Sequence, residues 1–395
     1  MKYRIDEKSG NRLSALGFGI MRLPKGVGGV GAIDMKKSER LIMKAIGEGV
    51  NYIDCAYLYA GSEAALGKIL SANNARDKVY IATKLPITKC KKNEDFDRFF
   101  SEQLASLQTD HVDYYLMHNI NDLIQWQGLK AIGIEKWIER KKSAGQIKQI
   151  GFSFHGTRAE FLKVIDDYDW DFCQIQYNYS DENYQAGVTG LRRAAQKHMP
   201  VIIMEPLLGG KLANGLPKRV EDTFKRVNPN LSPAAWGLRW LLNQPEVTVI
   251  LSGMNGDDQL TDNLRTADSI EPRELTSAEL TAYAEAVKIF RESYKIPCTG
   301  CGYCLPCPQG INIPGCFASH NASYAIGRVT GFVQYVTSTG ANRVTASTAS
   351  KCAACGKCAR HCPQNIDIPN RMKDVARRME PLYMKLVIKA IRKVV

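Results

Sequence analysis

Short apolar runs alternate with amphipathic stretches of ten or more residues along the first 290 residues of the chain. Runs of this length are typical of buried strands, and the stretches between them, such as residues 35–49 and 62–73, have the spacing of helices. Eight strands that each lead into a helix close into a (β/α)8 barrel of the TIM type. We therefore predict an α/β protein with a barrel built on eight runs, which are residues 14–21, 51–56, 78–85, 112–119, 147–154, 171–178, 200–207 and 247–254.

Four polar residues follow the first predicted strands at their carboxyl ends, where barrels of this type carry their active sites. They are Asp54, Tyr59, Lys84 and His118. Taken alone, each has a structural explanation, as a helix cap, a half-buried ring, a surface amine or a core imidazole. Taken together, an acid, a phenol, an amine and an imidazole at the ends of three successive strands indicate a proton-donating site.

The chemistry of such a site depends on the tyrosine. A phenol with a pKa of about 10 is a weak acid at neutral pH unless a nearby cation stabilises its phenolate. Lys84 is the cation available to Tyr59, and Asp54 is the group that would hold its ammonium in place. His118 would orient a carbonyl or pass the proton.

The order and spacing of these four residues resemble the aldo-keto reductase family. Its D-x-A-x-x-Y segment corresponds to residues 54–59, followed by Gly61 and Glu63, its lysine strand to residues 82–84, and its histidine strand to residues 116–118. The resemblance spans residues 10 to 290. It implies that Tyr59 is the general acid and that a nicotinamide cofactor delivers hydride to a carbonyl carbon.

The same resemblance implies a set of cofactor contacts. Ser153 stands where the family's Ser-Asn pair holds the carboxamide, with Phe154 in place of the Asn, and Gln174 matches the family's carboxamide-binding Gln. Met204 occupies the position at which many members stack a Tyr on the nicotinamide. Asn263 matches the Asn that contacts the adenine, although a place on the surface of a helix explains it equally well.

Residues 252–259 form the segment in which the family often places Lys and Arg against the 2′-phosphate of NADP. It begins with Ser252 and Gly253, ends with Gln259, and contains two aspartates instead of those cations. Like charge repels a phosphate. We therefore expect NADH to bind at least as well as NADPH.

Nine of the twelve cysteines lie in residues 298–362. Residues 352–363 have the C-x2-C-x2-C-x3-C-P spacing of bacterial ferredoxins, and residues 298–308 repeat it with one residue fewer before the last Cys. The repeat continues, since residues 309–314 match residues 364–369. Two four-iron clusters explain this pattern better than zinc, the competing interpretation.

In two-cluster ferredoxins the last Cys of each run ligates the other cluster. With this exchange, each cluster takes three cysteines from one run and the last cysteine of the other run. The alternative is that each cluster takes all four cysteines from a single run. The exchanged sets are Cys298, Cys301, Cys304 and Cys362, and then Cys307, Cys352, Cys355 and Cys358. Cys316 is a spare that we expect to be buried.

Three parts follow from these patterns: the barrel in residues 1–290, a mainly helical ferredoxin-like domain in residues 291–370, and a basic amphipathic helix in residues 371–395. A helical stretch over residues 322–336 separates the two cysteine runs. The terminal helix begins at Met372, with apolar positions at Leu382, Leu386, Val387, Ala390 and Ile391. A membrane surface would suit it, but we favour packing on the barrel.

Composition narrows the class of protein. Hydrophobic residues make up 45% and charged residues 24% of the chain, which are globular values. The formal net charge is +13, and residues 371–395 alone carry eight Lys or Arg against two Asp or Glu. Basic residues do not alternate with aromatic ones, which argues against nucleic acid. A charged start without an apolar leader predicts a cytoplasmic protein.

Hydride transfer moves two electrons and each cluster moves one, so the two halves need an intermediary that the sequence does not identify. We favour an oxidoreductase that acts on a small carbonyl or sugar-like substrate and exchanges electrons with an acidic carrier such as a ferredoxin or flavodoxin. One alternative is an aldo-keto reductase with structural or regulatory clusters. Another is a binding subunit that senses the nucleotide.

Overall fold

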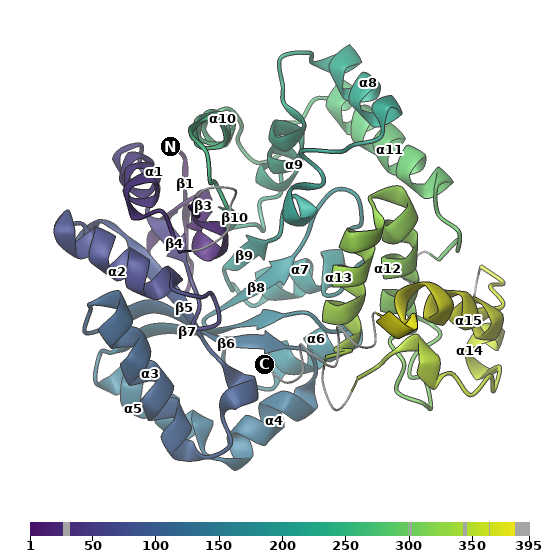
Figure 1. Ribbon diagram of the computed structural model, residues 1–395, viewed down its shortest axis with the longest axis horizontal. Coiled ribbons are helices and arrows are strands. Elements are labelled where there is room, and N and C mark those ends of the chain that lie inside the picture. The colour runs from purple at the N-terminus through teal and green to yellow at the C-terminus, as the bar shows by residue number, and fades with distance from the viewer. Residues whose placement is uncertain (27–31, 299, 301, 343–345, 363, 384–395) are drawn as a thin grey trace.

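The computed structural model describes residues 1–26, 32–298, 300, 302–342, 346–362 and 364–383. Eight parallel strands close into a barrel in the order β10-β3-β4-β5-β6-β7-β8-β9 (Figure 1). Each strand coincides with one predicted apolar run, so the predicted barrel is confirmed. The strands are β3 (Leu16–Gly19), β4 (Tyr52–Asp54), β5 (Tyr80–Leu85), β6 (Val112–Ile120), β7 (Ile147–Phe154), β8 (Phe172–Gln176), β9 (Val201–Met204) and β10 (Val249–Ser252).

Helices surround the barrel and cover its strands (Figure 1). Several begin at a side chain that caps the first turn: Asp34 accepts from the amide of Lys37, and Ser232 accepts from the amide of Ala235. The helices are α1 (Met35–Gly47), α2 (Ser62–Ala72), α3 (Asn93–Leu107), α4 (Leu123–Ala131), α5 (Ile134–Ser143), α6 (Arg158–Asp166), α7 (Gly187–Gln196), α8 (Lys218–Val227), α9 (Pro233–Leu242), α10 (Asp257–Asp268) and α11 (Ser277–Glu292).

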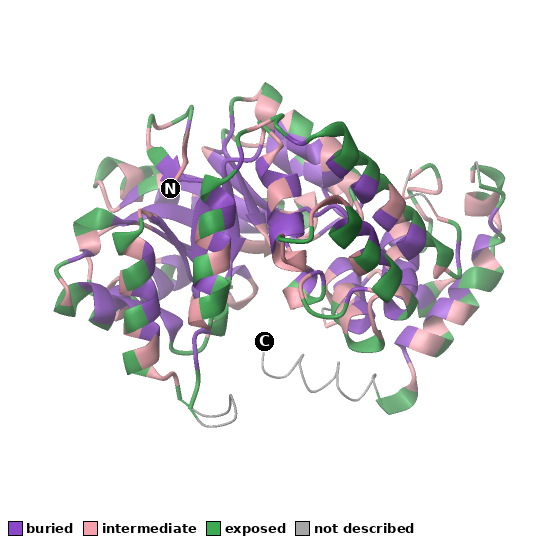
Figure 2. Ribbon diagram, turned by 90° about the horizontal axis from the view of Figure 1, so that it is seen from above, coloured by how far each residue is buried: buried purple, intermediate pink, exposed green. Residues whose placement is uncertain are grey.

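The barrel interior is a packed core. Buried residues from the strands, among them Tyr52, Tyr114 and Phe172, fill its amino end. A hairpin of β1 (Tyr3–Ile5) and β2 (Arg12–Ser14) closes this end. It is held there by a hydrogen bond of 2.8 Å from the Tyr114 hydroxyl to Asp6, which lies between the two strands. Figure 2 shows the buried strands inside and the exposed positions on the outer faces of the helices. Because the amino end of the barrel is filled, the candidate site can lie only at its carboxyl end.

After residue 292 every regular element in the described part of the chain is helical, as predicted. The elements are α12 (Ile313–Ala325), α13 (Arg328–Thr339), the short turn η6 (Ala349–Lys351), α14 (Lys357–Arg360) and α15 (Ile368–Met379). This tail packs against barrel loops that follow β7 and β8. Arg158 donates to the carbonyl of Gly300, and the Tyr184 hydroxyl donates to the carbonyl of Gln334 at 3.1 Å.

Two predicted helices of the tail differ from the structure. The stretch over residues 322–336 is broken at Gly327, whose φ of 128° is a conformation that suits glycine. Two helices, α12 and α13, result. Helix α15 begins at Ile368, four residues before the predicted start, and ends at Met379, two residues before Pro381; Leu382 and Tyr383 are helical again, and both are exposed. The predicted positions Leu386, Val387, Ala390 and Ile391 lie outside the described residues, which contain no helix long and apolar enough to span a bilayer.

Candidate functional site

Lys84 is the central group at the carboxyl end of the barrel. Its Nζ lies 2.6 Å from both carboxylate oxygens of Asp54 and 2.6 Å from the carbonyl oxygen of Cys55. The neighbouring strands β4 and β5 bring these groups together. Burial is the largest single influence and lowers the pKa of Lys84, but the charge and hydrogen bond of Asp54 together with the charge of Tyr59 raise it, and the net shift is upward. The ammonium therefore stays charged although only 1% of Lys84 is exposed.

Tyr59 and His118 complete the group of four. Lys84 Nζ lies 5.0 Å from the centre of the Tyr59 ring, and the ring of His118 meets that of Tyr59 edge-on at 5.8 Å. Burial raises the pKa of the Tyr59 phenol, while the Lys84 charge opposes that shift. The structure thus brings together the four residues that the sequence singled out. In this arrangement the Tyr59 phenol keeps its proton. When that proton is transferred, the Lys84 ammonium lies beside the phenolate that remains.

A buried polar network behind Lys84 was missed at the level of sequence. Glu63 Oε1 accepts from Thr83 at 2.5 Å and from Gln103 at 2.7 Å, and Gln103 also donates to the carbonyl of Lys84 at 3.1 Å. Tyr115 donates to Gln103 Oε1 at 2.7 Å. The sequence did contain one sign of this network, because Gln103 interrupts the apolar face of α3. This network fixes the strand that carries the ammonium.

Ser153, Gln174 and Met204 lie on the neighbouring strands β7, β8 and β9. Gln174 donates from Nε2 to Asp54 at 3.0 Å, while its Oε1 is buried without a partner among the described residues. An amide N–H, such as the carboxamide of a nicotinamide, is the donor that this oxygen lacks. Ser153 accepts from the backbone amide of Asn119 at 2.7 Å. These residues therefore fit the group that the sequence predicts.

Phe154 does not share this site. Its ring is buried against Phe161, with 5.1 Å between the ring centres, so it packs among the outer helices. Successive strand residues point to opposite faces, which explains why Ser153 and Phe154 differ. Phe154 therefore cannot replace the Asn that accompanies this Ser in related sequences.

The segment after β10 joins the barrel to α10. Asn263 donates from Nδ2 to the hydroxyl of Ser252 at 2.8 Å, and both residues are buried. Gln259 accepts from the amide of Asn255 at 3.0 Å, while Gly253 is exposed. Asp257 is paired with Arg40 of α1 at 2.6 Å. One of the two aspartates expected to repel a 2′-phosphate therefore has a cationic partner.

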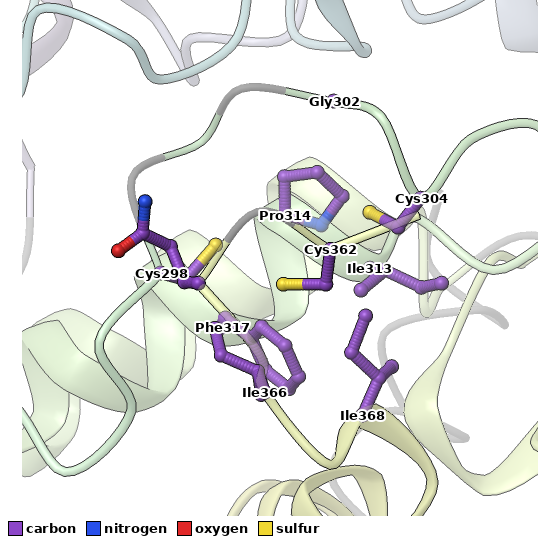
Figure 3. A pocket seen from close by; sticks show the side chains of 10 residues that line it. Cys298, Gly302, Cys304, Ile313, Pro314, Phe317, Cys362, Ile366 and Ile368 are labelled. Atoms are coloured by element: carbon purple, nitrogen blue, oxygen red, sulfur yellow. The ribbon is translucent and has the colours of Figure 1, made fainter. Parts of the chain in front are cut away.

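The cysteines of the tail are divided between two pockets. Cys298, Cys304 and Cys362 line the first, and Figure 3 shows their sulfur atoms pointing toward one space walled by Phe317, Ile366 and other apolar residues. Cys301, assigned to the same cluster, lies outside the described residues. The backbone amide of Gly300 donates to the sulfur of Cys298 at 3.4 Å. Thiols around an apolar pocket suit an iron–sulfur cluster.

Cys307, Cys352, Cys355 and Cys358 line the second pocket. Each pocket thus contains a cysteine from the other run, which is the grouping that exchange of the last cysteines predicts. Pairing within each run would require Cys362 and Cys307 to change places. Cys316 is buried and lines neither pocket.

The repeated sequence after each cysteine run gives the same local structure twice. Asn312 caps α12 and Asp367 caps α15, and a proline lies in the first turn of both helices. The isoleucines that follow the caps, Ile313 and Ile368, line both pockets. The duplication therefore builds two related walls around the cysteine pockets.

A cavity of about 830 Å³ lies between the barrel and the tail. Loops after β6, β7 and β8 form its barrel side, including Asp122, Arg158 and Asp181. Residues next to the cysteine pockets, such as Cys298 and Cys307, form the other side. Burial raises the pKa of Asp181 to about 6. The cavity places ligands of both predicted clusters on a space shared with the carboxyl end of the barrel.

Comparisons with known protein families divide the chain in the same way. Residues 15–285 match the aldo/keto reductase family, and residues 297–366 match the 4Fe-4S dicluster domain. The first match corresponds to the barrel and the second to the tail. The resemblances found in the sequence are thereby confirmed.

Individual relatives support the match of the barrel to this family. The aldo-keto reductase YhdN of Bacillus subtilis is 32% identical over 304 residues, which cover 66% of this chain and 87% of the relative. The NADH-specific methylglyoxal reductase of Escherichia coli is 24% identical and is covered over 95% of its length, with 67% of this chain. An aldo-keto reductase from Bacillus halodurans in its holo form shares the fold, with a TM-score of 0.57 and 23% identity over 72% of this chain and 96% of that one.

Proposed function

Because the chain belongs to the aldo/keto reductase family, we propose that it interconverts a small carbonyl or sugar-like substrate and its alcohol, using a nicotinamide cofactor. Two 4Fe-4S clusters in the tail exchange electrons with a one-electron carrier. The observation that carries the proposal is the placement of the Lys84 ammonium between Asp54 and the ring of Tyr59. We place this oxidoreductase in the cytoplasm, where a reducing environment preserves its many thiols.

Tyr59 is the general acid of the proposed reaction. Its half-buried phenol has a raised pKa and so keeps its proton at neutral pH until the substrate oxygen gains charge. Lys84 then stabilises the phenolate, and Asp54 holds the ammonium in position. His118, at the edge of the Tyr59 ring, orients the carbonyl oxygen. A nicotinamide held there would supply the hydride chemistry, giving hydride to the carbonyl carbon or taking it from the alcohol carbon.

The cofactor is held by residues from β7 to α10. Ser153 and the oxygen of Gln174, which has no partner among the described residues, would bind the carboxamide, and Met204 would lie against the nicotinamide ring. Ser252, Gly253, Gln259 and Asn263 bind the adenosine half. We propose that NADH binds at least as well as NADPH, since Asp257 and Asp258 add no positive charge to this segment. Titration of the purified protein with both nucleotides tests this, and a strong preference for NADPH would contradict it.

The clusters are held by the two exchanged cysteine sets, Cys298, Cys301, Cys304 and Cys362 for one and Cys307, Cys352, Cys355 and Cys358 for the other. Anaerobic purification followed by iron and acid-labile sulfide analysis tests this part. Two four-iron clusters require about eight iron and eight sulfide per chain. A content near one or two metal ions without sulfide would overturn it.

The catalytic part is tested with Tyr59→Phe, which removes the acidic hydroxyl but keeps the ring. We expect turnover of carbonyl substrates with NADH to fall on the order of a hundredfold or more, because general acid catalysis contributes that much. Nucleotide binding should be retained. A Tyr59→Phe protein that keeps full turnover would exclude the proposed acid. Tyr57→Phe, in the same turn but hydrogen-bonded to Glu102, is the control.

A further inference from the structure

Three basic side chains stand beside the second cysteine pocket. Lys351, Lys357 and Arg360 are exposed, and within the described part of the chain none of them forms an ion pair. Lys357 and Arg360 begin and end α14, so they are one helical turn apart. Lys351 immediately precedes Cys352. We call these three side chains the basic rim.

Nothing in the adjoining sequence neutralises the basic rim. The chain contains no Asp or Glu between Glu292 and Asp367, although it contains Lys and Arg in that interval. Two acidic residues lie further along: Asp374, on α15, is already paired with Arg371 and Arg377, and Glu380 is buried, accepts from the amide of Ser350 and the hydroxyl of Tyr335, and forms no ion pair with the rim within the described residues. The rim therefore presents a positive field to solvent, and such fields steer oppositely charged partners toward a surface.

The rim lies where a second protein can reach the cluster ligands. Cys355, one of the four cysteines of the second pocket, is exposed. Figure 1 places α14 at the end of the long axis that is opposite to α1 and α2 of the barrel. The first cysteine run touches the barrel directly, since Gly300 contacts Arg158 of α6, whereas Cys298 of the first pocket and Cys307 of the second both line the cavity between the two parts.

We propose that the basic rim is the docking surface for an acidic one-electron carrier protein. Electrons would enter or leave the tail at the cluster held by Cys307, Cys352, Cys355 and Cys358, and would pass between it and the cluster of the pocket of Cys298, Cys304 and Cys362. In each encounter the reduced carrier loses one electron and the cluster in the outer pocket gains it. This inference rests on the proposed function, because it requires loaded clusters.

The chemistry of the surface favours a protein carrier over a lipid surface. Within residues 351–361 the exposed side chains are small or polar, namely Ala353, Ala354, Cys355 and His361, apart from the rim itself. No large apolar side chain is exposed there to enter a bilayer. A flavodoxin or a small ferredoxin with an acidic surface matches both the charge and the one-electron chemistry.

The test measures electron transfer directly. Full-length, cluster-loaded protein is mixed anaerobically with a reduced acidic flavodoxin, and the rate of cluster bleaching is followed by stopped flow over a range of salt concentrations. The rim variant is K351E/K357E/R360E. The control is K36E/K68E/K136E, which reverses three exposed lysines without ion pairs on α1, α2 and α5 and changes the net charge equally.

At low salt we expect the second-order rate of the rim variant to fall at least about tenfold, as expected for lost steering. The control should keep its rate within about twofold of the original protein, and the difference should shrink as salt rises, because screening weakens charge attraction. Equal slowing of both variants would show a net-charge effect and overturn the docking surface. An unchanged rate in the rim variant would overturn it as well.

Two further measurements separate this inference from the proposed function. Dithionite must bleach the clusters of all three proteins, because it does not dock. If dithionite bleaches the clusters of the original protein and the carrier does not, the proposed docking surface is wrong, but the cluster part of the proposed function is retained. If iron is absent from the original protein, the cluster part of the proposed function is wrong. Should charge reversal lower the iron content, K351Q/K357Q/R360Q replaces it, with rates compared at matched iron and a smaller, salt-dependent loss expected.

Discussion

The guanidinium of Arg158, in the first turn of α6, donates a hydrogen bond to the carbonyl of Gly300, which lies inside the first cysteine run. Gly300 has a φ of 70°, and a side chain there would approach Cβ of Asn183 to 3.2 Å. Gly300 is thus held against the barrel. One side chain links the part that carries the proposed hydride chemistry to the part that carries the proposed clusters.

Removal of this link should loosen the first cluster. In Arg158→Ala the charge-assisted bond to Gly300 is lost, and such bonds contribute about 1.5–3 kcal/mol. We expect iron release to a chelator to become several-fold faster under anaerobic conditions, with half of the iron affected. Lys163→Ala, on the same helix but paired with Glu160, is the control. Identical release from both variants would mean that the contact does not support the cluster.

Asp54→Asn should weaken the proposed catalytic group without removing it. The Asp54 carboxylate raises the pKa of both Lys84 and Tyr59, so its loss lowers both values. We expect kcat/KM to fall on the order of a hundredfold. The alkaline limb of its pH profile should move to lower pH. An unmoved limb would contradict the proposed coupling, and Asp34→Asn, which keeps a good helix cap on α1, is the control.

The exchange of cysteines between the two runs has a clear consequence for double variants. Cys298 and Cys362 line one pocket, so Cys298→Ser with Cys362→Ser should damage one cluster and leave about four iron atoms. Cys298→Ser with Cys307→Ser should damage both. Pairing within each run predicts the reverse result. Iron and sulfide analysis with the electron paramagnetic resonance spectrum of the reduced protein distinguishes the two patterns.

The pair of Arg40 and Asp257 should influence the choice of nucleotide. Asp257 occupies the guanidinium of Arg40 at 2.6 Å. In Asp257→Ala that cation becomes available for a 2′-phosphate, and we expect the affinity for NADPH relative to NADH to rise several-fold. Adding Arg40→Ala to this variant should abolish the gain. Fluorescence titration with both nucleotides measures it, and a gain that survives in the double variant would rule out this explanation.

His320 should make the tail sensitive to acid. It is 2% exposed, and burial, together with the charge of Arg378, lowers its pKa to about 4 from 6.5. The folded tail therefore favours the neutral ring, so its stability is complete above pH 6.5 and declines as the pH falls toward 4. Scanning calorimetry between these values should show a smaller loss of Tm for His320→Gln than for the original protein.

The control for His320 is His198→Gln, an exposed imidazole on the barrel that contacts Glu7. Acid also attacks iron–sulfur clusters, and this effect is common to all three proteins. The effect of the buried imidazole is therefore the difference in Tm loss between His320→Gln and the other two proteins. A parallel decline in all three would show that His320 does not titrate in this range.

Much of the fold was predictable because its signals are local. Alternation of apolar runs with amphipathic stretches identified all eight barrel strands, and the repeated cysteine runs identified the tail. Errors arose where a single backbone feature decides the result, as at Gly327, where a positive φ separates two helices. At the end of α15 the cause is different: Pro381 disfavours the helical conformation of Glu380, and the helix ends at Met379.

The sequence by itself determined which chemical groups are available: the Asp54, Tyr59, Lys84 and His118 set and two runs of cysteines with cluster spacing. Their order at strand ends also determined that they face one end of the barrel. These conclusions depend on periodicity and on spacings of a few residues, which local backbone geometry fixes.

Only the tertiary structure decided which groups meet. Arg40 and Asp257 are 217 positions apart, and Arg158 and Gly300 are 142 apart. Such contacts form when the barrel closes and the tail packs on it, because packing of buried apolar surface sets the relative positions of distant segments. The neutralisation of Asp257 and the contact of the first cysteine run with the barrel are consequences of that packing.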